Sequence, residues 1–332
     1  MLNRRQLRVK VLQVLYALSQ GNSVEINEAN KKLEESFASF ENLYLSLLHL
    51  LVEVRDYAQY RIDEAKKKNL PTEADLNPNL RFVKNQCFDL IEHDPKFQSY
   101  LIPFEPKEDE KPKEKKARLK KLEKYVDWKE QRSFVKSIYF AIRESDLYER
   151  YMSREENNLK IDSQFLEDVY IKIIAPSEDL HYILEEQNVF WVDDMPLANS
   201  MILKTLAMMY KPDFDSALLP LFKENQDKRF TRDLLENCIL YKEQLEELVV
   251  EKAQNWEKER IAVLDRLLME MALCEMLYFP TVPVKVSINE YIELSKDYST
   301  PKSKVFINGV LDKLHKDLKK DNQIKKSGRG LI

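Results

Sequence analysis

The sequence predicts an all-α fold, and two observations carry that prediction. Apolar residues recur at the three- and four-residue spacing of amphipathic helices along most of the 332-residue chain. No convincing set of alternating strands is present, because the few β-rich stretches, such as YIKII at residues 170–174, are short. With 44% hydrophobic and 33% charged residues, the chain has the composition of a globular protein.

The first helix is expected to begin at Asn3, because Asn3 and Gln6 have the spacing of a capping box. Its buried stripe is predicted to comprise Leu7, Val11, Val14, Leu15 and Leu18. Long amphipathic stretches then predict helix from about residue 25 to 68, and the stretch PTEADLNPN at residues 71–79 interrupts the pattern.

Residues 103–125 form a charged, proline-containing linker that is predicted to become helical toward its end. Acidic residues are interleaved with its lysines, which favours a solvated face, and nucleic-acid binding is the alternative interpretation. Further along, Thr231 is expected to cap a helix, and Ser287 with Glu290 has capping-box spacing for another. Pro301 is expected to begin the last helix, whose buried stripe comprises Ile307, Val310, Leu311 and Leu314.

Composition argues against several classes of protein. Gly21 is the only glycine in the first 308 residues, so the glycine-rich loops that bind nucleotide phosphates are absent. The three cysteines and four histidines are scattered without metal-ligand spacing, so no metal or cofactor is expected. No apolar run approaches the roughly 20 residues of a membrane span, and we expect a cytoplasmic protein without a membrane partner.

Positive charge is concentrated at the two ends of a chain whose net charge is −4. Residues 1–20 contain Arg4, Arg5, Arg8 and Lys10 and no acidic residue, and the segment after Asp312 is also rich in lysine. Such segregation is typical of a surface that faces a polyanion. On a helical wheel Arg5 and Arg8 fall with Leu12 and Tyr16, away from the predicted stripe; an RNA-binding face and a plain surface helix both fit.

The last helix carries a second basic line, in which Lys302, Phe306, Gly309 and Lys313 lie roughly 90–110° from the centre of the apolar stripe. An aromatic ring among lysines suits a single-stranded nucleic acid, whose bases stack on the ring while its phosphates attract the cations. The alternative is that Phe306 belongs to the edge of the core.

Three stretches of this sequence resemble the NusB transcription antitermination family: RRQLRVKVLQVLYAL at residues 4–18, the helical segment at 230–256, and residues 261–314, especially VPVKVSINEYIELSK and FINGVLDKL. The resemblance implies a discontinuous NusB-like helical bundle made of residues 1–22 and 213–318. Residues 23–212 are then a helical insertion of unassigned role, and residues 319–332 a basic flexible tail.

The resemblance also implies a function without enzymatic activity. Family members bind the single-stranded boxA element of ribosomal RNA operon transcripts together with NusE, a ribosomal protein of the small subunit, within the transcription elongation complex. Two alternatives stay open, a protein-interaction scaffold that uses the insertion and a relative of RNA cytosine methyltransferases, which carry a NusB-like domain. The missing glycine-rich turns argue against the methyltransferase.

Carried over residue by residue, the resemblance places RNA binding at Arg4, Arg5, Arg8, Lys302, Lys304 and Phe306. It places Tyr16 and Asp265 near the NusE-facing surface. Three positions depart from the family pattern and bear on RNA preference: Lys302 stands where an acidic residue is frequent, Ser299 where glycine is frequent, and Glu270 where a basic residue is frequent.

Overall fold

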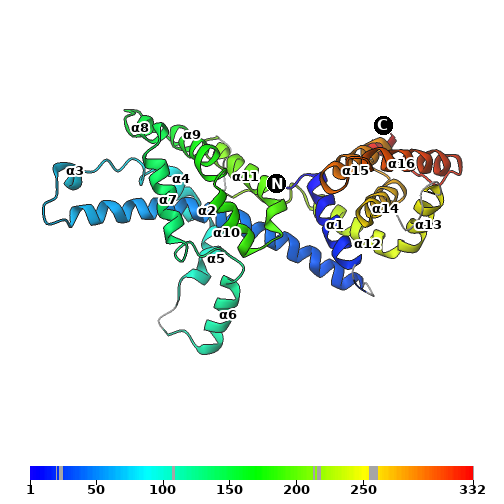
Figure 1. Ribbon diagram of the computed structural model, residues 1–332, viewed down its shortest axis with the longest axis horizontal. Helices are drawn as coiled ribbons and strands as arrows, with labels where there is room; N and C mark the ends of the chain where they lie inside the picture. The colour runs from blue at the N-terminus through cyan, green and yellow to red at the C-terminus, as the bar shows by residue number, and fades with distance from the viewer. Residues whose placement is uncertain are drawn as a thin grey trace. The chain divides into compact units, whose positions relative to one another are not determined.

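The computed structural model describes residues 1–19, 21, 25–106, 109–211, 214, 218–253 and 261–331. Within these ranges helices are the only regular secondary structure, which confirms the all-α prediction (Figure 1). The chain divides into two compact units, one made of Met1–Phe37 and Leu221–Ile332 and the other of Ala38–Pro220. The domain junctions predicted at 22/23 and 212/213 fall on residues outside the described ranges.

The first unit is built around one central helix. Its elements are α1 (Arg4–Ser19), the start of α2 (Ile26–Lys66), α12 (Asn225–Leu240), α13 (Lys242–Lys252), α14 (Val263–Tyr278), α15 (Val284–Tyr298), α16 (Ser303–Lys320) and the 3₁₀ turn η4 (Gly328–Leu331). Helix α14 contacts α1, α12, α13, α15 and α16 (Figure 1). Every residue from Leu267 to Met276 is buried, as expected for a helix that other helices surround.

The helices at the two ends of the chain bury the predicted stripes. In α1 the Asn3 Oδ1 accepts from the Gln6 backbone N–H at 3.0 Å and the Gln6 Oε1 accepts from the Asn3 N–H at 2.8 Å, so the predicted capping box is confirmed. All five predicted stripe residues of α1 and all four of α16 are buried. Helix α16 begins at Ser303, two residues after the start predicted at Pro301, because residues 301–302 form a turn.

Two predicted helix caps are wrong. Thr231 lies inside α12, which begins at Asn225, and its hydroxyl donates to the Asp227 carbonyl one turn earlier. Helix α15 begins at Val284, so Ser287 and Glu290 lie within it and do not form a capping box. Their side chains instead bind groups on α14 and α1, because tertiary partners were available that a local sequence pattern does not show.

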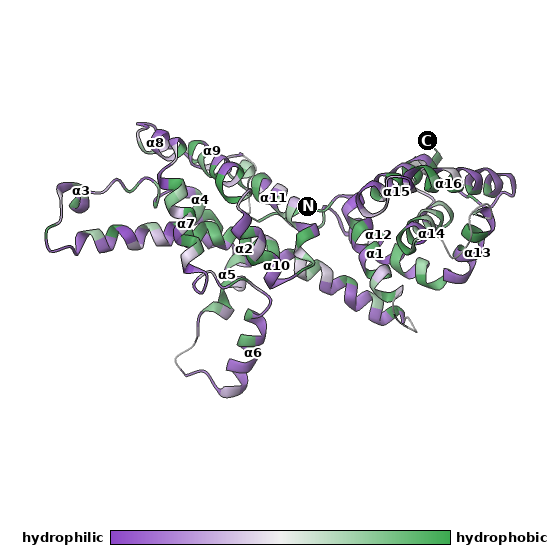
Figure 2. Ribbon diagram, viewed as in Figure 1, coloured by the Kyte–Doolittle hydropathy of each residue, from purple (hydrophilic) through white to green (hydrophobic). Residues whose placement is uncertain are grey.

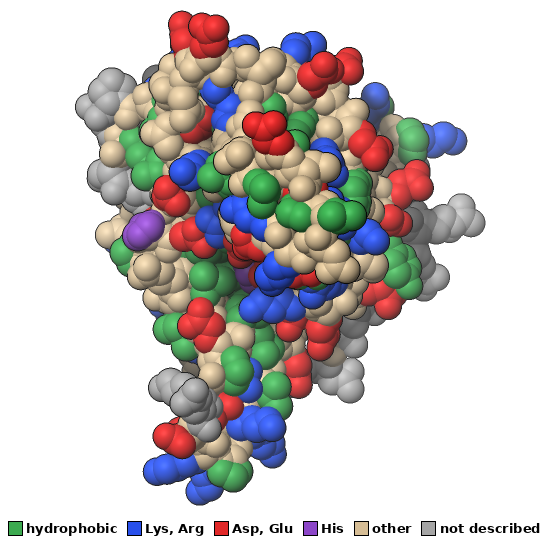
Figure 3. Space-filling view, turned by 90° about the vertical axis from the view of Figure 1, so that its left-hand side faces the viewer, with side chains coloured by type: hydrophobic (Ala, Val, Ile, Leu, Met, Phe, Trp, Pro, Cys, Tyr) green, Lys and Arg blue, Asp and Glu red, His purple; other side chains and the backbone are tan. Residues whose placement is uncertain are grey.

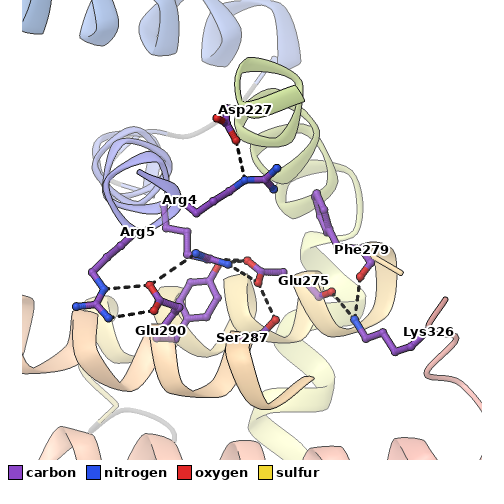
Figure 4. Close-up of polar contacts among 10 residues, drawn as sticks. Arg4, Arg5, Asp227, Glu275, Phe279, Ser287, Glu290 and Lys326 are labelled. Atoms are coloured by element: carbon purple, nitrogen blue, oxygen red, sulfur yellow. Dashed lines mark hydrogen bonds and ion pairs between the residues drawn. The ribbon is translucent and has the colours of Figure 1, made fainter. Parts of the chain in front are cut away.

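Part of the segment expected to be a flexible tail is held at the C-terminal end of α14. The Lys326 Nζ donates to the carbonyl oxygens of Glu275 at 3.2 Å and Phe279 at 2.9 Å (Figure 4). A lysine is well suited to this place, because the last carbonyls of a helix lack partners within the helix. Burial lowers the pKa of Lys326.

The second unit contains the rest of α2 and shorter helices. These are α3 (Glu73–Leu76), α4 (Gln86–His93), α5 (Pro95–Leu101), the 3₁₀ turn η1 (Ile102–Phe104), α6 (Pro112–Leu122), α7 (Arg132–Arg143), α8 (Asp146–Met152), α9 (Leu159–Val169), the π-helical turn η2 (Tyr170–Ile174), α10 (Glu178–Gln187) and α11 (Trp191–Met209). This unit has its own aromatic core against α2. The indole N–H of Trp128 donates to the Ser46 carbonyl at 2.8 Å, and that of Trp191 to the Ser39 carbonyl at 3.0 Å.

Helix α2 has an apolar middle and becomes hydrophilic toward Lys66 (Figure 2). Among the described helices it is the one long and apolar enough to cross a membrane by length and composition. Of its most apolar window, 72% is buried against the rest of the protein. That degree of burial is what the core helix of a soluble protein shows.

Two leucines on α12 provide a test of the core. Leu234 is fully buried, whereas 62% of Leu240 is exposed. We expect Leu234→Ala to lower the free energy of unfolding by about 2–5 kcal/mol, through lost apolar burial and a cavity. Leu240→Ala is the matched control and should change it by less than about 0.5 kcal/mol. Urea unfolding followed by far-UV circular dichroism measures both, and equal effects would contradict the burial pattern.

Candidate RNA-binding surface

Two arginines at the start of α1 pair with carboxylates and stay partly exposed. The Arg4 Nε lies 2.8 Å from the Asp227 Oδ1 on α12 (Figure 4). The Arg4 guanidinium also lies 4.3 Å from the ring centre of Phe230. Arg5 donates from Nε and Nη2 to the two carboxylate oxygens of Glu290 on α15, both at 3.0 Å. The side chain of Arg5 is 43% exposed, so it is accessible to a ligand.

The third arginine, Arg8, is buried at the centre of a polar cluster, with 3% of its side chain exposed. It donates from Nε and Nη2 to the Glu275 carboxylate at 2.8 and 2.6 Å. The Ser287 hydroxyl donates to the same carboxylate at 2.7 Å and the Tyr291 hydroxyl at 3.2 Å. Burial alone lowers the pKa of Arg8, but the hydrogen bonds and charge of Glu275 outweigh that effect and raise it, so Arg8 stays charged.

The wheel placed Arg8 and Leu12 on a face separate from the core, and for these two residues that placement is wrong. Both are buried, because α1 is contacted by α12, α14 and α15 rather than by one neighbour. Tyr16, farther along the same line, is exposed. The arginine-rich start of α1 therefore divides into two accessible cations and one internal cation.

A cleft of about 1200 Å³ lies beside Arg4 and Arg5. Its other wall comes from the connection between α14 and α15 and from the first turn of α15, with Val282, Pro283 and Val286. Guanidinium groups and apolar side chains that line one cleft suit a ligand that carries both phosphates and flat apolar surfaces. Glu290 also lines the cleft and competes with any phosphate for Arg5.

The start of α16 forms a second candidate surface. Lys302 and Lys304 are exposed, and Phe306 is half-buried beside the fully buried stripe residue Ile307. Gly309 follows one turn later, and nothing lies within 4 Å of the place where a Cβ would stand. The ring of Phe306 thus lies between the core and solvent, with cations and an open stretch of helix backbone near it in the sequence.

Asp265 does not lie on an exposed surface. It is buried, and it accepts from the Ser303 hydroxyl at 2.8 Å and from the Ser299 hydroxyl. These contacts fix the turn between α15 and α16. Ser299 stands where the family often has glycine. Its hydrogen bond to Asp265 therefore helps to hold the turn that carries Lys302 and Lys304.

Helix α15 connects the two candidate surfaces. Glu290 at the cleft and Ser299 before α16 are nine residues apart, which is about 13 Å along a helix. Acidic residues lie on the intervening turns. The hydrogen bonds that Arg5 donates to Glu290, and then the charges of Glu290, Glu293 and Asp297, raise the pKa of Arg5. A polyanion that binds both surfaces must pass these carboxylates.

Glu270, which stands where the family often has a basic residue, is also internal and so does not lie on an exposed RNA surface. It is buried in α14, with its Oε1 3.6 Å from the Nε of Arg266. Neither of these two buried atoms has a hydrogen-bond partner. Burial raises the pKa of Glu270 to about 7, although the charge of Arg266 acts in the opposite direction.

Sequence reasoning missed the residues that hold Arg8 in place, namely Glu275, Ser287, Tyr291 and Glu290. One signal was available. Glu270 and Glu275 interrupt the otherwise apolar stretch LLMEMALCEML, and a carboxylate buried in such a helix requires a partner.

The internal and accessible arginines should differ in their effect on stability. We expect Arg8→Ala to lower the free energy of unfolding by about 3–5 kcal/mol, because Glu275 is left buried without its cation. Arg5→Ala removes an exposed pair and should cost less than about 1 kcal/mol. Urea unfolding gives both values, and hydrogen exchange of the α14 amides localises the change. A small effect at Arg8 would disprove its role as a buried anchor.

Glu270 predicts a dependence of stability on pH. Its folded pKa of about 7 exceeds the ordinary value of 4.5, so between these two pH values the folded protein holds a proton that the unfolded chain releases. The free energy of unfolding therefore falls as the pH rises through this window. Glu270→Gln should stabilise the protein by up to about 3 kcal/mol at pH 8 and hardly at all at pH 4, at roughly 1.4 kcal/mol per pH unit. Unfolding of both proteins across pH checks this, and a difference that is independent of pH would contradict it.

Comparison with known proteins identifies the family. The sequence model of the NusB family matches residues 200–316. The transcription antitermination protein NusB of Salinibacter ruber is 38% identical over 142 residues, which cover 41% of this chain and 89% of the relative. NusB of Chloroherpeton thalassium is 43% identical over 105 residues, covering 32% of this chain and 50% of the relative.

Two further matches are more limited. NusB of Desulfosudis oleivorans is 46% identical over 76 residues, covering 23% of this chain and 49% of the relative. A solved structure of NusB from T. maritima, at 22% identity, covers 48% of this chain and 89% of that one, with a TM-score of 0.27 that adds nothing to the assignment. The match to nearly the full length of the Salinibacter protein is decisive: the chain belongs to the NusB family of transcription antitermination proteins.

Proposed function

We propose that this protein is a cytoplasmic, non-catalytic RNA-binding adaptor in transcription antitermination. It binds a boxA-type single-stranded element in ribosomal RNA operon transcripts, together with the ribosomal protein NusE, within the elongation complex. Residues 1–22 and 213–318 supply the RNA-binding domain, and residues 23–212 are an insertion into it. The observation that carries the proposal is the cleft that the accessible Arg4 and Arg5 line together with apolar residues of the α14–α15 connection.

The expected RNA contacts are of two kinds. Arg4, Arg5, Lys302 and Lys304 attract phosphates, and Phe306 offers the exposed part of its ring to a base. Arg8 acts indirectly, since it fixes the start of α1 to α14 and α15 from inside.

Affinity for RNA alone should be modest. Asp227 and Glu290 already pair with Arg4 and Arg5, so each phosphate contact replaces an existing ion pair. A partner protein that adds its own contacts then makes the complex tighter. Tyr16 is exposed and suits such a partner, whereas Asp265 supports the α15–α16 turn from within.

A gel-shift titration tests the function as a whole. A boxA-like RNA is titrated with the protein, with and without NusE, at about 50 and 200 mM salt. A weak, salt-sensitive complex that NusE tightens is the expected result. No tightening by NusE would refute the joint binding, and equal affinity for an RNA with the boxA-like element scrambled would refute the assigned element.

Phe306→Ala tests the stacking contact. We expect it to weaken binding of the boxA-like RNA by about 1–3 kcal/mol, because a base loses its aromatic partner. Val305→Ala is the matched control: Val305 is 69% exposed on the same turn but lies off the basic line, and its loss should leave RNA affinity unchanged. Thermal unfolding of both variants accompanies the titration. Unchanged affinity with a sharp loss of stability would make Phe306 a core residue instead.

A further inference from the structure

Helix α6, in the second unit, carries an excess of positive charge. It has six basic side chains and one acidic one, Glu114. Five of its lysines are exposed: Lys113, Lys115, Lys116, Lys120 and Lys121. The acidic residues that interleave with lysine in the linear sequence lie mainly before the helix, so the structure separates charges that the sequence mixes. Figure 3 shows Lys and Arg side chains gathered at the tip of the lower lobe, which is the α6 segment of Figure 1.

The base of this helix is fixed to the rest of its unit. The largely buried Arg118 donates from Nε to the Glu110 Oε1 at 2.8 Å and from Nη1 to the Pro103 carbonyl at 3.1 Å. Helix α6 packs on η1, and after it Tyr125 lies against Tyr100, with ring centres 4.7 Å apart. Arg118 thus anchors the helix, and the five lysines remain exposed to solvent or to a ligand.

Only two of the five lysines, Lys120 and Lys121, lie in the last turn, where the helix dipole favours cations. Lys113 lies in the first turn, where the helix dipole disfavours a cation, and Lys116 and Lys120 are like charges four residues apart. Within the ranges that the structure describes, no ion pair involves any of the five. The carboxylate of Glu114 is instead engaged at the helix start, where it accepts from the Lys111 N–H at 3.3 Å.

We infer that α6 is a second RNA-binding surface, which holds the sugar–phosphate backbone of the transcript without reading its sequence. Exposed like charges on one helix repel one another, and a polyanion that neutralises them relieves this repulsion. The exposed apolar side chains of α6 are Pro112, Ala117 and Leu119, too few for a membrane-bound face. Lysine is also depleted from the cores of protein interfaces, which argues against a protein ligand. This role goes beyond the proposed function and does not require boxA recognition.

The test uses a 30-nucleotide oligouridylate, about the length of a short transcript segment, because binding to phosphates is independent of sequence. The variant K113Q/K115Q/K116Q/K120Q/K121Q removes the charges and keeps good helix formers. We expect at least a roughly tenfold loss of affinity at low salt. The slope of log affinity against log salt should become shallower by up to about 3.5, at roughly 0.7 for each phosphate that is no longer neutralised.

Two controls make the result specific. The variant K66Q/K84Q/K129Q/K136Q/K160Q removes the same charge from five exposed lysines that are spread over the second unit, and it should bind nearly as the parent protein does. Arginine at the five α6 positions should restore binding, which also shows that the site and not the fold was altered. Equal losses in the two glutamine variants would mean a general effect of net charge and overturn the inference. Unchanged binding in the α6 variant would overturn it too and leave an acidic protein as the ligand of α6.

Discussion

The buried ion pair between Arg8 and Glu275 is the constraint on which the first unit depends. It joins the first helix of the chain to α14, although 267 residues separate the two positions. Ser287 and Tyr291 of α15 donate to the same carboxylate, so three helices meet at one charge. Because an unpaired buried charge is strongly unfavourable, this cluster admits α1 in one orientation only. The pair therefore keeps α1 attached to α14, although the long insertion separates the two helices in the sequence.

This constraint decides which of the N-terminal arginines can meet a ligand. Arg8 neutralises Glu275 inside, and Arg4 and Arg5 are thereby held at the mouth of the cleft. Each of the outer arginines is nevertheless paired with a carboxylate, Arg4 with Asp227 and Arg5 with Glu290, which also lies near Arg8. Exposed pairs of this kind contribute little to stability, so they can be exchanged for phosphates at small cost. The surface is consequently suited to reversible binding that depends on salt and on a partner.

Periodicity predicted the parts of the fold that depend on local sequence. The stripes of α1 and α16, the Asn3 cap and the all-α class follow from residue spacing alone, and the structure confirms them. The start of α15 could not be predicted in this way, because Ser287 and Glu290 have the spacing of a cap and the chemistry of a tertiary site. The burial of Arg8 and Asp265 was equally hidden, since a wheel shows one helix and none of its neighbours. The first unit ends inside the continuous helix α2, so no break in the helical pattern of the sequence marks this boundary.

The protein as a whole is acidic, so its capacity to bind a polyanion depends on how folding distributes its cations. Arg8 and Arg118 are used internally, in ion pairs that position α1 and α6. The lysines of α6 and the first lysines of α16 remain at the surface, on helices that those anchors and the Asp265 contacts hold in place. A net charge of −4 repels RNA from most of the molecule and confines attraction to such places. The chemistry of the two side chains favours this division. The planar guanidinium of arginine can donate two hydrogen bonds at a buried position, whereas the flexible ammonium of lysine can adjust to the phosphates of an RNA backbone.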